Sequence, residues 1–438
     1  MGVRRSWWPT ALAVVFVVGC GSSAHVAPAR ISVTPAGALY DVPLSIVVSR
    51  LSAGEVVTIS ATSPRPGGVW SASATYKATG AGVVNVARMA PQSGSYHGVS
   101  PMGLFWSQRL VGAGSSANGS TVTTLVVRAD GQRIGSAAVT QRLIGPGVTE
   151  HTERRAKTGF VGDYFTPPGA ARGPAVVVWG GSEGGLGNSP ALAAMLASHG
   201  VPALAIAYFD EPGLPCALDD IPLEYFVKSI DWLRRQPQVE PGRVWILSVS
   251  RGSEADLLVA AHWPALVHGV IAAAPSSVVW GPISGQCRSI DDTSWTLHGQ
   301  PLDSATADTG YTRNPDGSLS GRGAFLSGLA GPGAAAARIP IERFKGPVML
   351  ISGADDQLWP SPVFADRIMA SLAADPARHV HLNYPDAGHL VFGIPSAPGA
   401  IEQKNAGGAL LDLGGTPAGD AAAHLSDWPS AIRFIQSN

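Results

Sequence analysis

Ser250 lies at the centre of ILSVSRGSEADLL, residues 246–258, in which an apolar run leads through small residues into a helical pattern. The run Ser248-Val249-Ser250-Arg251-Gly252 is close to the Gly-x-Ser-x-Gly of a nucleophile elbow, with a serine at the first glycine position. An elbow holds its serine on a sharp strand-to-helix turn, and small neighbours two residues away let strand and helix approach closely. The pattern predicts that Ser250 is a nucleophile, although a serine that caps the following helix would fit the same place.

An acid and a histidine follow Ser250 in the order that an α/β-hydrolase requires. The segment ISGADDQLWPS places Asp355 and Asp356 just after an apolar strand pattern, and NYPDAGHLVFG places His389 after the last one. The frame Gly-x-x-Asp-x-x-x-Pro favours Asp356 as the acid that orients the histidine, with Asp355 in reserve. The same residues would also fit a surface ion pair or a turn.

Hydrolysis by a serine also needs hydrogen-bond donors for the oxyanion. In this arrangement one donor is the backbone N–H after the nucleophile, which belongs to Arg251. The second donor comes from the loop after the first long strand, here GGSEGG at 180–185, with Ser182 favoured and Glu183 second. A plain glycine loop without a ligand remains the alternative, and the absence of lysine disfavours a phosphate-binding loop.

The bulk composition indicates a chain with a large core and no nucleic-acid partner. Of the 438 residues, 45% are hydrophobic and 14% are charged. The formal net charge is −1, from 30 basic and 31 acidic residues, without a basic block after the N-terminus. Binding to nucleic-acid phosphates needs clustered Lys and Arg, which this chain lacks.

The first 20 residues have the pattern of a cleaved export signal. Arg4 and Arg5 precede the apolar run WWPTALAVVFVVG, which ends at Cys20. This run is shorter than the ~20 residues that a spanning helix needs. The sequence VVGC resembles a bacterial lipobox, so we expect a lipoprotein signal peptide over 1–20, lipidation of Cys20 and a mature protein anchored outside the cytoplasmic membrane. The alternative is an ordinary secretory signal with an incidental cysteine.

Two further cysteines, Cys216 and Cys287, remain after Cys20. In an oxidising compartment two leftover cysteines often form a disulfide, but two separate small apolar residues fit the sequence equally well. His379 and His381 share one face of a predicted strand without a matching ligand cluster, so no metal site is expected there. No metal and no diffusible cofactor is expected elsewhere.

The chain divides into two halves with different periodicities. Residues 31–145 hold about seven short, often alternating β-branched runs such as EVVTISATS and TVTTLVVRAD, separated by Gly, Pro and Asp-Gly. This pattern predicts a β-sandwich of immunoglobulin type. The apolar segment PMGLFWS, residues 101–107, is expected to be a loop or edge that contacts the next domain.

Residues 159–438 alternate unbroken apolar strand patterns with helical ones. PAVVVWGG, VPALAIAYF, RVWILSVS, VHGVIAAAP, GPVMLISG and HVHLNYP read as buried strands, with helical patterns between most of them. Strands that are covered on both faces have this composition, so a mostly parallel sheet covered by helices is predicted. Residues 281–340 are Gly-rich and weakly periodic, which indicates an insertion of the kind that caps a site.

Several long segments are similar to the acyl-CoA thioesterase / bile acid-CoA:amino acid N-acyltransferase family. These segments are ISVTPAGALYDVPLSI, PMGLFWS, VVVWGGSEGG, PLEYF, SVSRGSEADLL, APSSVVWG, ISGADDQLWPS and YPDAGHL, and together they span nearly the whole chain from residue 31. The resemblance implies an immunoglobulin-like domain on an α/β-hydrolase domain, with acyl thioesters as substrates. It also implies Ser250 as nucleophile, Asp356 as acid and His389 as base. The amidating branch of the family uses cysteine as nucleophile, so Ser250 favours hydrolysis.

The sequence therefore predicts a lipid-anchored serine hydrolase that cleaves acyl thioesters or esters. Trp280, Leu358 and Trp359 are expected to line an acyl pocket, although each would also fit a plain core. The competing interpretation is a non-catalytic surface protein that binds ligands on a hydrolase scaffold, and a third is an acyltransferase. Besides substrate and membrane, the sequence indicates no partner, and it leaves the oligomeric state open.

Overall fold

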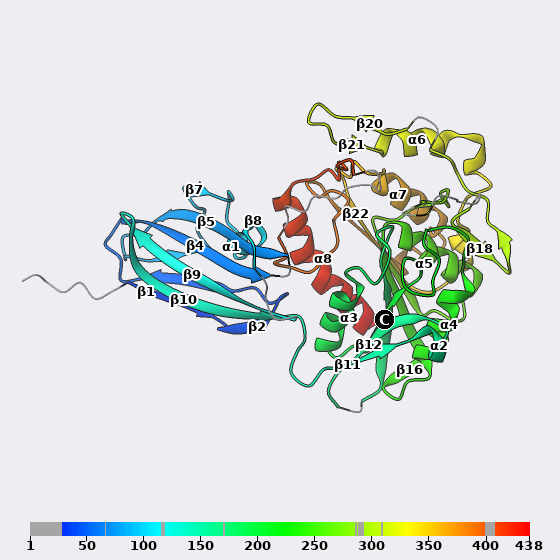
Figure 1. Cartoon of the computed structure of the whole chain (residues 1–438), viewed down its shortest axis with the longest axis horizontal. Helices are drawn as coiled ribbons and strands as arrows, with labels where there is room; N and C mark the ends of the chain where they lie inside the picture. The colour runs from blue at the N-terminus through cyan, green and yellow to red at the C-terminus, as the bar shows by residue number, and fades with distance from the viewer. Residues whose placement is uncertain are drawn as a thin grey trace, which may run out of the picture.

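The computed structural model describes residues 29–65, 67–114, 119–169, 171–284, 287, 293–307, 310–398 and 408–438. The predicted signal segment with Cys20 lies outside these residues. Figure 1 shows an N-terminal β-sandwich (blue to cyan) beside a larger α/β body (green to red). None of the helices in the described ranges combines the length and the hydropathy that crossing a bilayer requires.

The N-terminal body is a sandwich of two sheets. One sheet has the order β1-β3-β6, and the other has the order β2-β10-β9-β4-β5-β7, with β8 paired to β5. In β4, buried and less buried residues alternate, because successive side chains point to opposite faces of a sheet and only one face meets the core. The strand bounds are β1 Arg30–Thr34, β2 Gly37–Leu39, β3 Ser45–Ser49, β4 Val56–Arg65, β5 Gly68–Lys77, β6 Val84–Asn85, β7 Ser93–Gly94, β8 Arg109–Gly112, β9 Ser120–Ala129 and β10 Gln132–Arg142.

The described part of this body has ten strands where the sequence predicts about seven. The additional ones are β2, β7 and β8, which are two to four residues long and too short to show a clear alternation. The segment PMGLFWS is also not a loop or an edge strand. It forms the short helix α1, Gly103–Trp106, whose four residues are all buried.

The C-terminal body contains an eight-stranded sheet with the order β11-β12-β14-β13-β16-β17-β22-β23. From β14 to β23 the neighbouring strands run parallel, whereas β11 and β12 are antiparallel at one edge. This is the sheet of an α/β-hydrolase, as the sequence predicts. The strand bounds are β11 Thr149–Glu153, β12 Val161–Thr166, β13 Gly173–Trp179, β14 Ala203–Ala207, β16 Val239–Val249, β17 Gly269–Ala273, β22 Val348–Gly353 and β23 His379–Tyr384.

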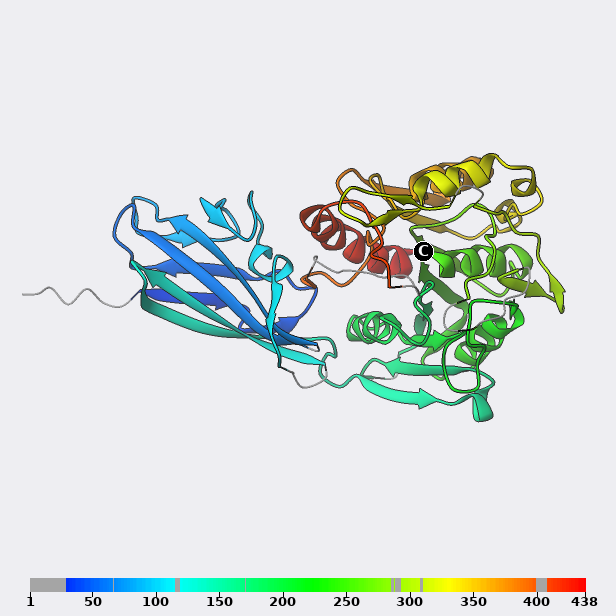
Figure 2. The same ribbon diagram turned by 45° about the horizontal axis from the view of Figure 1, so that its top comes forward.

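Helices cover both faces of this sheet, which is why its central strands are apolar without interruption. Even-numbered residues of β13, such as Val176 and Val178, share one core with α3 and α8, and odd-numbered ones, such as Val177, share the other with α4, α5 and α7. Figure 2 shows α8 and α3 on the side that faces the sandwich. The helix bounds are α2 Arg155–Thr158, α3 Ser189–Ser198, α4 Glu224–Arg234, α5 Arg251–His262, α7 Ser361–Ser371 and α8 Pro417–Ser437.

The two bodies share apolar and polar contacts. Ala421 of α8 belongs to the apolar core around α1, so the expected contact between 101–107 and the second body is present. Asp41, which follows β2, accepts a hydrogen bond of 2.8 Å from the indole of Trp428 in α8 and lies 2.5 Å from the imidazole of His199 after α3. The sandwich is therefore fixed on the helical layer of the second body.

The weakly periodic segment between β17 and β22 contains short elements. It lies over one end of the sheet, and Figure 1 shows α6 beside α7 at that end. Within the segment β18 pairs with β19 and β20 with β21, and β15, which lies earlier in the chain just before α4, pairs with β18. The bounds are β15 Ile221–Pro222, β18 Trp295–Leu297, β19 Gln300–Pro301, β20 Thr312–Arg313, β21 Leu319–Ser320 and α6 Arg322–Ala330, with 3-10 turns at η1 Pro332–Ala334, η2 Ile341–Arg343 and η3 Pro376–Arg378.

Candidate active site

Ser250 occupies the sharp turn between β16 and α5. Its backbone has φ 55° and ψ −127°, a conformation that is strained for a residue with a side chain. The turn requires a glycine at position 252, because a Cβ there would lie 2.2 Å from the carbonyl oxygen of Gly180. The structure therefore forms the elbow although Ser248 stands at the first glycine position.

Asp356 follows β22 and is completely buried. Its Oδ1 accepts hydrogen bonds from the backbone N–H groups of Leu358, at 3.1 Å, and Trp359, at 3.2 Å. Its Oδ2 accepts a hydrogen bond of 2.6 Å from the hydroxyl of Ser361 at the start of α7. These donors fix the position and orientation of the carboxylate.

His389 lies between Asp356 and Ser250. Its Nδ1 is 2.9 Å from Asp356 Oδ2, and its Nε2 is 2.9 Å from Ser250 Oγ. The backbone N–H of His389 donates a 2.7 Å hydrogen bond to Leu413, which anchors the loop after β23. An imidazole held in this way is able to take a proton from a hydroxyl on one side while a carboxylate stabilises the resulting cation on the other.

The reserve acid, Asp355, faces a different set of groups. Its Oδ2 accepts a 3.0 Å hydrogen bond from the backbone N–H of Gly415, and its Oδ1 one of 2.7 Å from Gln357. Asp355 therefore supports the segment before α8, whereas Asp356 contacts His389.

The two expected oxyanion donors belong to residues that line the same cavity as Ser250. Arg251 is the first residue of α5, where a backbone N–H has no partner within the helix. Ser182 lines the same cavity as Ser250, and a Cβ at Gly181 would lie 3.0 Å from Ser250 Cβ. In the described part of the chain, neither the Arg251 nor the Ser182 N–H donates to another backbone group.

The side chain of Arg251 connects the nucleophile helix to the inserted segment. Its Nη1 donates a 3.0 Å hydrogen bond to Gly281, and its Nη2 donates to the backbone oxygen of Trp280, at 2.8 Å, and to Ser294 Oγ, at 2.6 Å. The buried carboxylate of Glu254 lies 2.7 Å from Arg251 Nε. Burial raises the pKa of Glu254, and the charge of Arg251 opposes that shift.

An apolar cavity of about 460 Å³ opens beside Ser250. The three residues expected at its wall, Trp280, Leu358 and Trp359, all line it. Phe325 of α6 completes the aromatic wall, with ring centres 4.7 Å from Trp280 and 5.7 Å from Trp359. The cavity has the size and lining that are typical of small-molecule sites.

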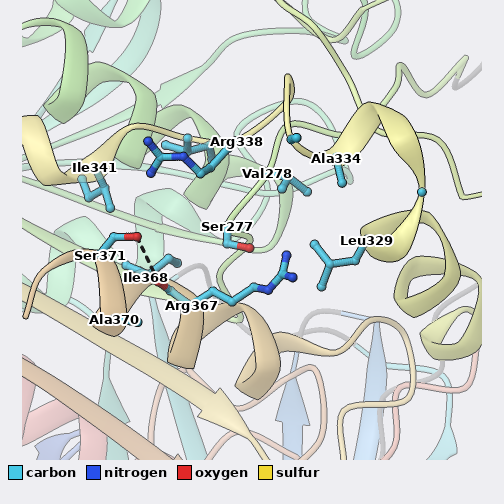
Figure 3. A pocket seen from close by; sticks show the side chains of 13 residues that line it. Ser277, Val278, Leu329, Ala334, Arg338, Ile341, Arg367, Ile368, Ala370 and Ser371 are labelled. Carbon is cyan, nitrogen blue, oxygen red and sulfur yellow. Dashed lines mark hydrogen bonds between the residues drawn. The ribbon is translucent and has the colours of Figure 1, made fainter.

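Figure 3 shows a second cavity, of about 420 Å³, between the inserted segment and α7. Apolar residues such as Val278 and Leu329 form its walls, and Arg338 and Arg367 reach over it. Arg338 is paired with Glu342 at 2.7 Å. Ser250 and His389 do not line this cavity, so we assign the chemistry to the first one.

Cys216 and Cys287 form a disulfide, with their Cα atoms 6.0 Å apart. It connects the segment after β14 to the inserted segment. Close to it, Leu218 and Ile283 form an isolated β-bridge, and Ile283 lines the cavity beside Ser250. The cross-link therefore holds one wall of that cavity. Within the described ranges, no group of three or more His, Cys, Asp or Glu side chains is arranged to hold a metal ion.

The sequence alone did not indicate two polar residues that lie near the site. Ser361, which bonds Asp356, is one of many serines and stands in no motif of its own. Asp420 of α8 accepts a 2.9 Å hydrogen bond from the backbone N–H of Gly388, next to His389. Burial raises the pKa of Asp420 to about 6, and the nearby charge of Asp356 adds to this shift.

The strand order, the elbow and the hydrogen-bonded Ser250, His389 and Asp356 define a protein of the α/β-hydrolase class. Residues 221–438 match the family model described as "BAAT / Acyl-CoA thioester hydrolase C terminal". Residues 41–155 match the model "Acyl-CoA thioester hydrolase/BAAT N-terminal region". The chain belongs to this acyl-CoA thioesterase / bile acid-CoA:amino acid N-acyltransferase family.

Curated relatives match along nearly their whole length. Acyl-coenzyme A thioesterase 6 from Mus musculus is 29% identical over 427 residues, which cover 93% of this chain and 96% of the relative. Mitochondrial acyl-coenzyme A thioesterase 2 from Mus musculus is 28% identical, with coverages of 93% and 89%. Acyl-coenzyme A amino acid N-acyltransferase 1 from the same species is 27% identical, with coverages of 93% and 97%.

Proposed function

We propose that this protein is a serine hydrolase that cleaves acyl thioesters or esters through an acyl-enzyme. The observation that carries the proposal is the hydrogen-bonded series from Asp356 through His389 to Ser250, with both nitrogens of His389 at 2.9 Å from their partners. The family and the names of its thioesterase members support acyl thioesters as the substrate class.

The residues have distinct roles in the proposed reaction. His389 Nε2 takes the hydroxyl proton of Ser250 while Ser250 Oγ attacks the acyl carbonyl carbon. The N–H groups of Arg251 and Ser182 stabilise the oxyanion. The intermediate collapses as the bond to the thiol or alcohol breaks, and His389 returns the proton to this leaving group. Water, deprotonated by His389, then attacks the acyl-serine. The bond between the acyl group and Ser250 Oγ breaks, His389 returns the proton to Oγ, and the carboxylic acid is released.

Acyl transfer to an amine is the second candidate, because relatives at 27–29% identity include amino acid N-acyltransferases. Such a transfer replaces water by an amine in the second half-reaction. Hydrolysis is favoured because the nucleophile position holds a serine, and the resemblance associates amidation with a cysteine there.

We also propose that the protein is a lipoprotein attached through Cys20 outside the cytoplasmic membrane. The export pattern of residues 1–20 supports this location, and the disulfide suits an oxidising compartment. Because coenzyme A thioesters belong to the cytoplasm, this location favours an ester or a different thioester as natural substrate. Metabolic labelling with an alkyne fatty acid checks the anchor, and Cys20→Ala abolishes the label if the proposal holds.

The experiment for the activity compares the protein that begins after Cys20 with its Ser250→Ala variant. Both are assayed with short and long acyl-CoA thioesters and with p-nitrophenyl esters, in the presence and absence of glycine and taurine. We expect turnover to the free acid that falls by at least about 10³-fold in the variant. Conjugates as the main product would support the transferase, and no turnover in two folded proteins would favour the binding protein.

A further inference from the structure

The loop after β13 carries the second oxyanion donor, and two side chains fix its peptide groups from opposite sides. The hydroxyl of Tyr208, the first residue after β14, donates hydrogen bonds to the carbonyl oxygens of Gly181, at 2.5 Å, and Gly180, at 3.2 Å. The carboxylate of Glu183 accepts a 2.9 Å hydrogen bond from the N–H of Gly181. The peptide between Gly180 and Gly181 is therefore held at both its C=O and its N–H.

The contact with Tyr208 also determines where the next N–H points. In a trans peptide the C=O of one residue and the N–H of the following residue point in opposite directions. Since the C=O of Gly181 points to Tyr208, the N–H of Ser182 points away from Tyr208. Ser182 lines the cavity that Ser250 lines. This peptide orientation is the one that an oxyanion donor needs.

The glycines of the loop make room for the carboxylate of Glu183. A Cβ at Gly180 would lie 2.2 Å from Glu183 Oε1, and one at Gly187 would lie 2.9 Å from it. Although Glu183 as a whole residue is exposed, the backbone of Gly180 and Gly187 lies close around its carboxylate. Desolvation raises its pKa, while the N–H of Gly181 and the nearby His389 lower it.

Tyr208 is placed firmly enough to orient a peptide. It is 2% exposed, and its ring centre lies 5.2 Å from Phe226 and 5.8 Å from Trp295. Burial raises the pKa of Tyr208, so its hydroxyl remains a hydrogen-bond donor across the physiological range.

We propose that Tyr208 and Glu183 are positioning residues that hold the peptides of Gly180 and Gly181 so that the N–H of Ser182 completes the oxyanion hole. This inference rests on the proposed serine hydrolase function. Neither side chain touches the substrate. Each acts through the loop, so the loss of either lowers the turnover number more than it affects substrate binding.

The test uses Tyr208→Phe, with Tyr225→Phe as a matched control. Tyr225 is also a buried tyrosine whose hydroxyl donates to a backbone carbonyl, that of Ala207 at 2.6 Å, but its hydrogen bonds go to β14 and to the N–H of Val161 and not to the loop 180–185. In the full chain in detergent, we expect kcat to fall about 10- to 100-fold in Tyr208→Phe, with KM within about threefold. Tyr225→Phe should keep kcat, even if its melting temperature falls by as much as that of Tyr208→Phe.

Glu183 supplies the rescue experiment. Glu183→Ala removes the acceptor of the Gly181 N–H, whereas Glu183→Gln keeps an oxygen acceptor without the charge. We expect kcat to fall about tenfold in the alanine variant and to recover to at least about a third of the original value in the glutamine variant.

An alkyl boronic acid gives a readout that a purely structural role would not change. It forms a tetrahedral adduct on a nucleophilic serine and so requires the oxyanion donors, which a substrate does not need for binding. Its inhibition constant should rise at least tenfold in Tyr208→Phe. Equal kcat and equal inhibition constants in Tyr208→Phe and Tyr225→Phe would overturn the inference while the hydrolase function stands. An original chain without turnover, and with Ser250 unreactive to a fluorophosphonate, would overturn the function itself.

Discussion

The hydroxyl of Ser248 donates a hydrogen bond to the buried carboxyl group of Asp256, directly beneath the turn that presents Ser250. Ser248 occupies the position at which the elbow pattern has glycine, and Asp256 lies one helical turn and a half into α5. Burial raises the pKa of Asp256, and the hydrogen bond from Ser248 opposes this shift. The serine that stands in place of the pattern's glycine is therefore hydrogen-bonded to a buried residue. This contact between Ser248 and Asp256 connects β16 to α5.

This contact predicts that Ser248→Gly, which restores the usual pattern, destabilises the protein. The variant leaves the carboxyl group of Asp256 without its donor, and its free energy of unfolding should fall by about 1–3 kcal/mol. Catalytic turnover should change less than about threefold, because the strained turn at Ser250 depends on Gly252. Urea denaturation checks the stability. In the double variant Ser248→Gly/Asp256→Ala the loss should be smaller than the sum of the two single losses, whereas strict additivity would show that the residues are not coupled.

Neighbouring aspartates provide a direct test of the acid. Asp356→Asn should reduce kcat by about 10³- to 10⁴-fold, because an amide at 2.9 Å from His389 Nδ1 neither fixes the imidazole in the required tautomer nor stabilises its cation. Asp355→Asn, which alters the contact with Gly415, should retain at least about a third of the activity. Steady-state kinetics on both variants decide the matter, and equal losses would contradict the assignment of Asp356.

Much of the fold is predictable from local patterns. Buried parallel strands such as β16 and β22 are unbroken apolar runs, and the helices between them have clear periodicity, so type and order follow from the sequence. Helix α8 is different. Its first turn contains Gly419 and its interior contains Pro429, a residue that usually ends a helix. Its existence depends on packing against the sheet and α1.

The residues of the site also fall into two groups, those that local sequence patterns predict and those that depend on the folded structure. Ser250, Asp356 and His389 stand in motifs at the ends of strands, so their order along the chain indicates that they meet. Tyr208 and Asp420 act through contacts that only the folded chain creates, and no spacing relates them to the motif residues. Ser361 ends the segment ISGADDQLWPS, but nothing in that segment marks its hydroxyl as a donor to Asp356. Glu183 was within the predicted loop, but the direction of its carboxylate depends on the positive φ angles of the neighbouring glycines.

Asp420 gives a pH-dependent prediction. Its folded pKa of about 6 lies above the 3.8 of an aspartate in the unfolded chain, so folding disfavours the charged form. Above pH 6 this group lowers the free energy of unfolding, and the penalty disappears as the pH falls towards 4. Asp420→Asn, which keeps an acceptor for Gly388, should therefore stabilise the protein at pH 8 by about 1–3 kcal/mol and by much less at pH 4.5.

Urea denaturation at both pH values measures this difference. Asp231→Asn on the exposed face of α4 serves as the control, with an expected change within about 0.5 kcal/mol at either pH. A stabilisation of Asp420→Asn that is the same at pH 4.5 and pH 8 would show that ionisation of Asp420 is not its cause.

His199 and Asp41 predict the opposite pH dependence for the junction of the two bodies. The hydrogen bond with Asp41 raises the pKa of His199, and partial burial only partly opposes this. A group whose folded pKa is raised stabilises the fold fully below its unfolded value of 6.5, and this contribution is lost as the pH rises through the folded pKa. His199→Gln should therefore be less stable than the original chain by about 1 kcal/mol at pH 5.5, with a smaller difference at pH 9.

The comparison needs a readout that reports on the junction itself. The indole of Trp428 shares Asp41 with His199, so its fluorescence should change when the junction opens. His151→Gln on the exposed strand β11 is the matched control, because this histidine lies away from Asp41. If His199→Gln and His151→Gln show the same pH dependence from 5.5 to 9, the contact between Asp41 and His199 does not stabilise the junction. A loss that is confined to His199→Gln and to low pH assigns this part of the stability to one ion pair between the sandwich and the hydrolase body.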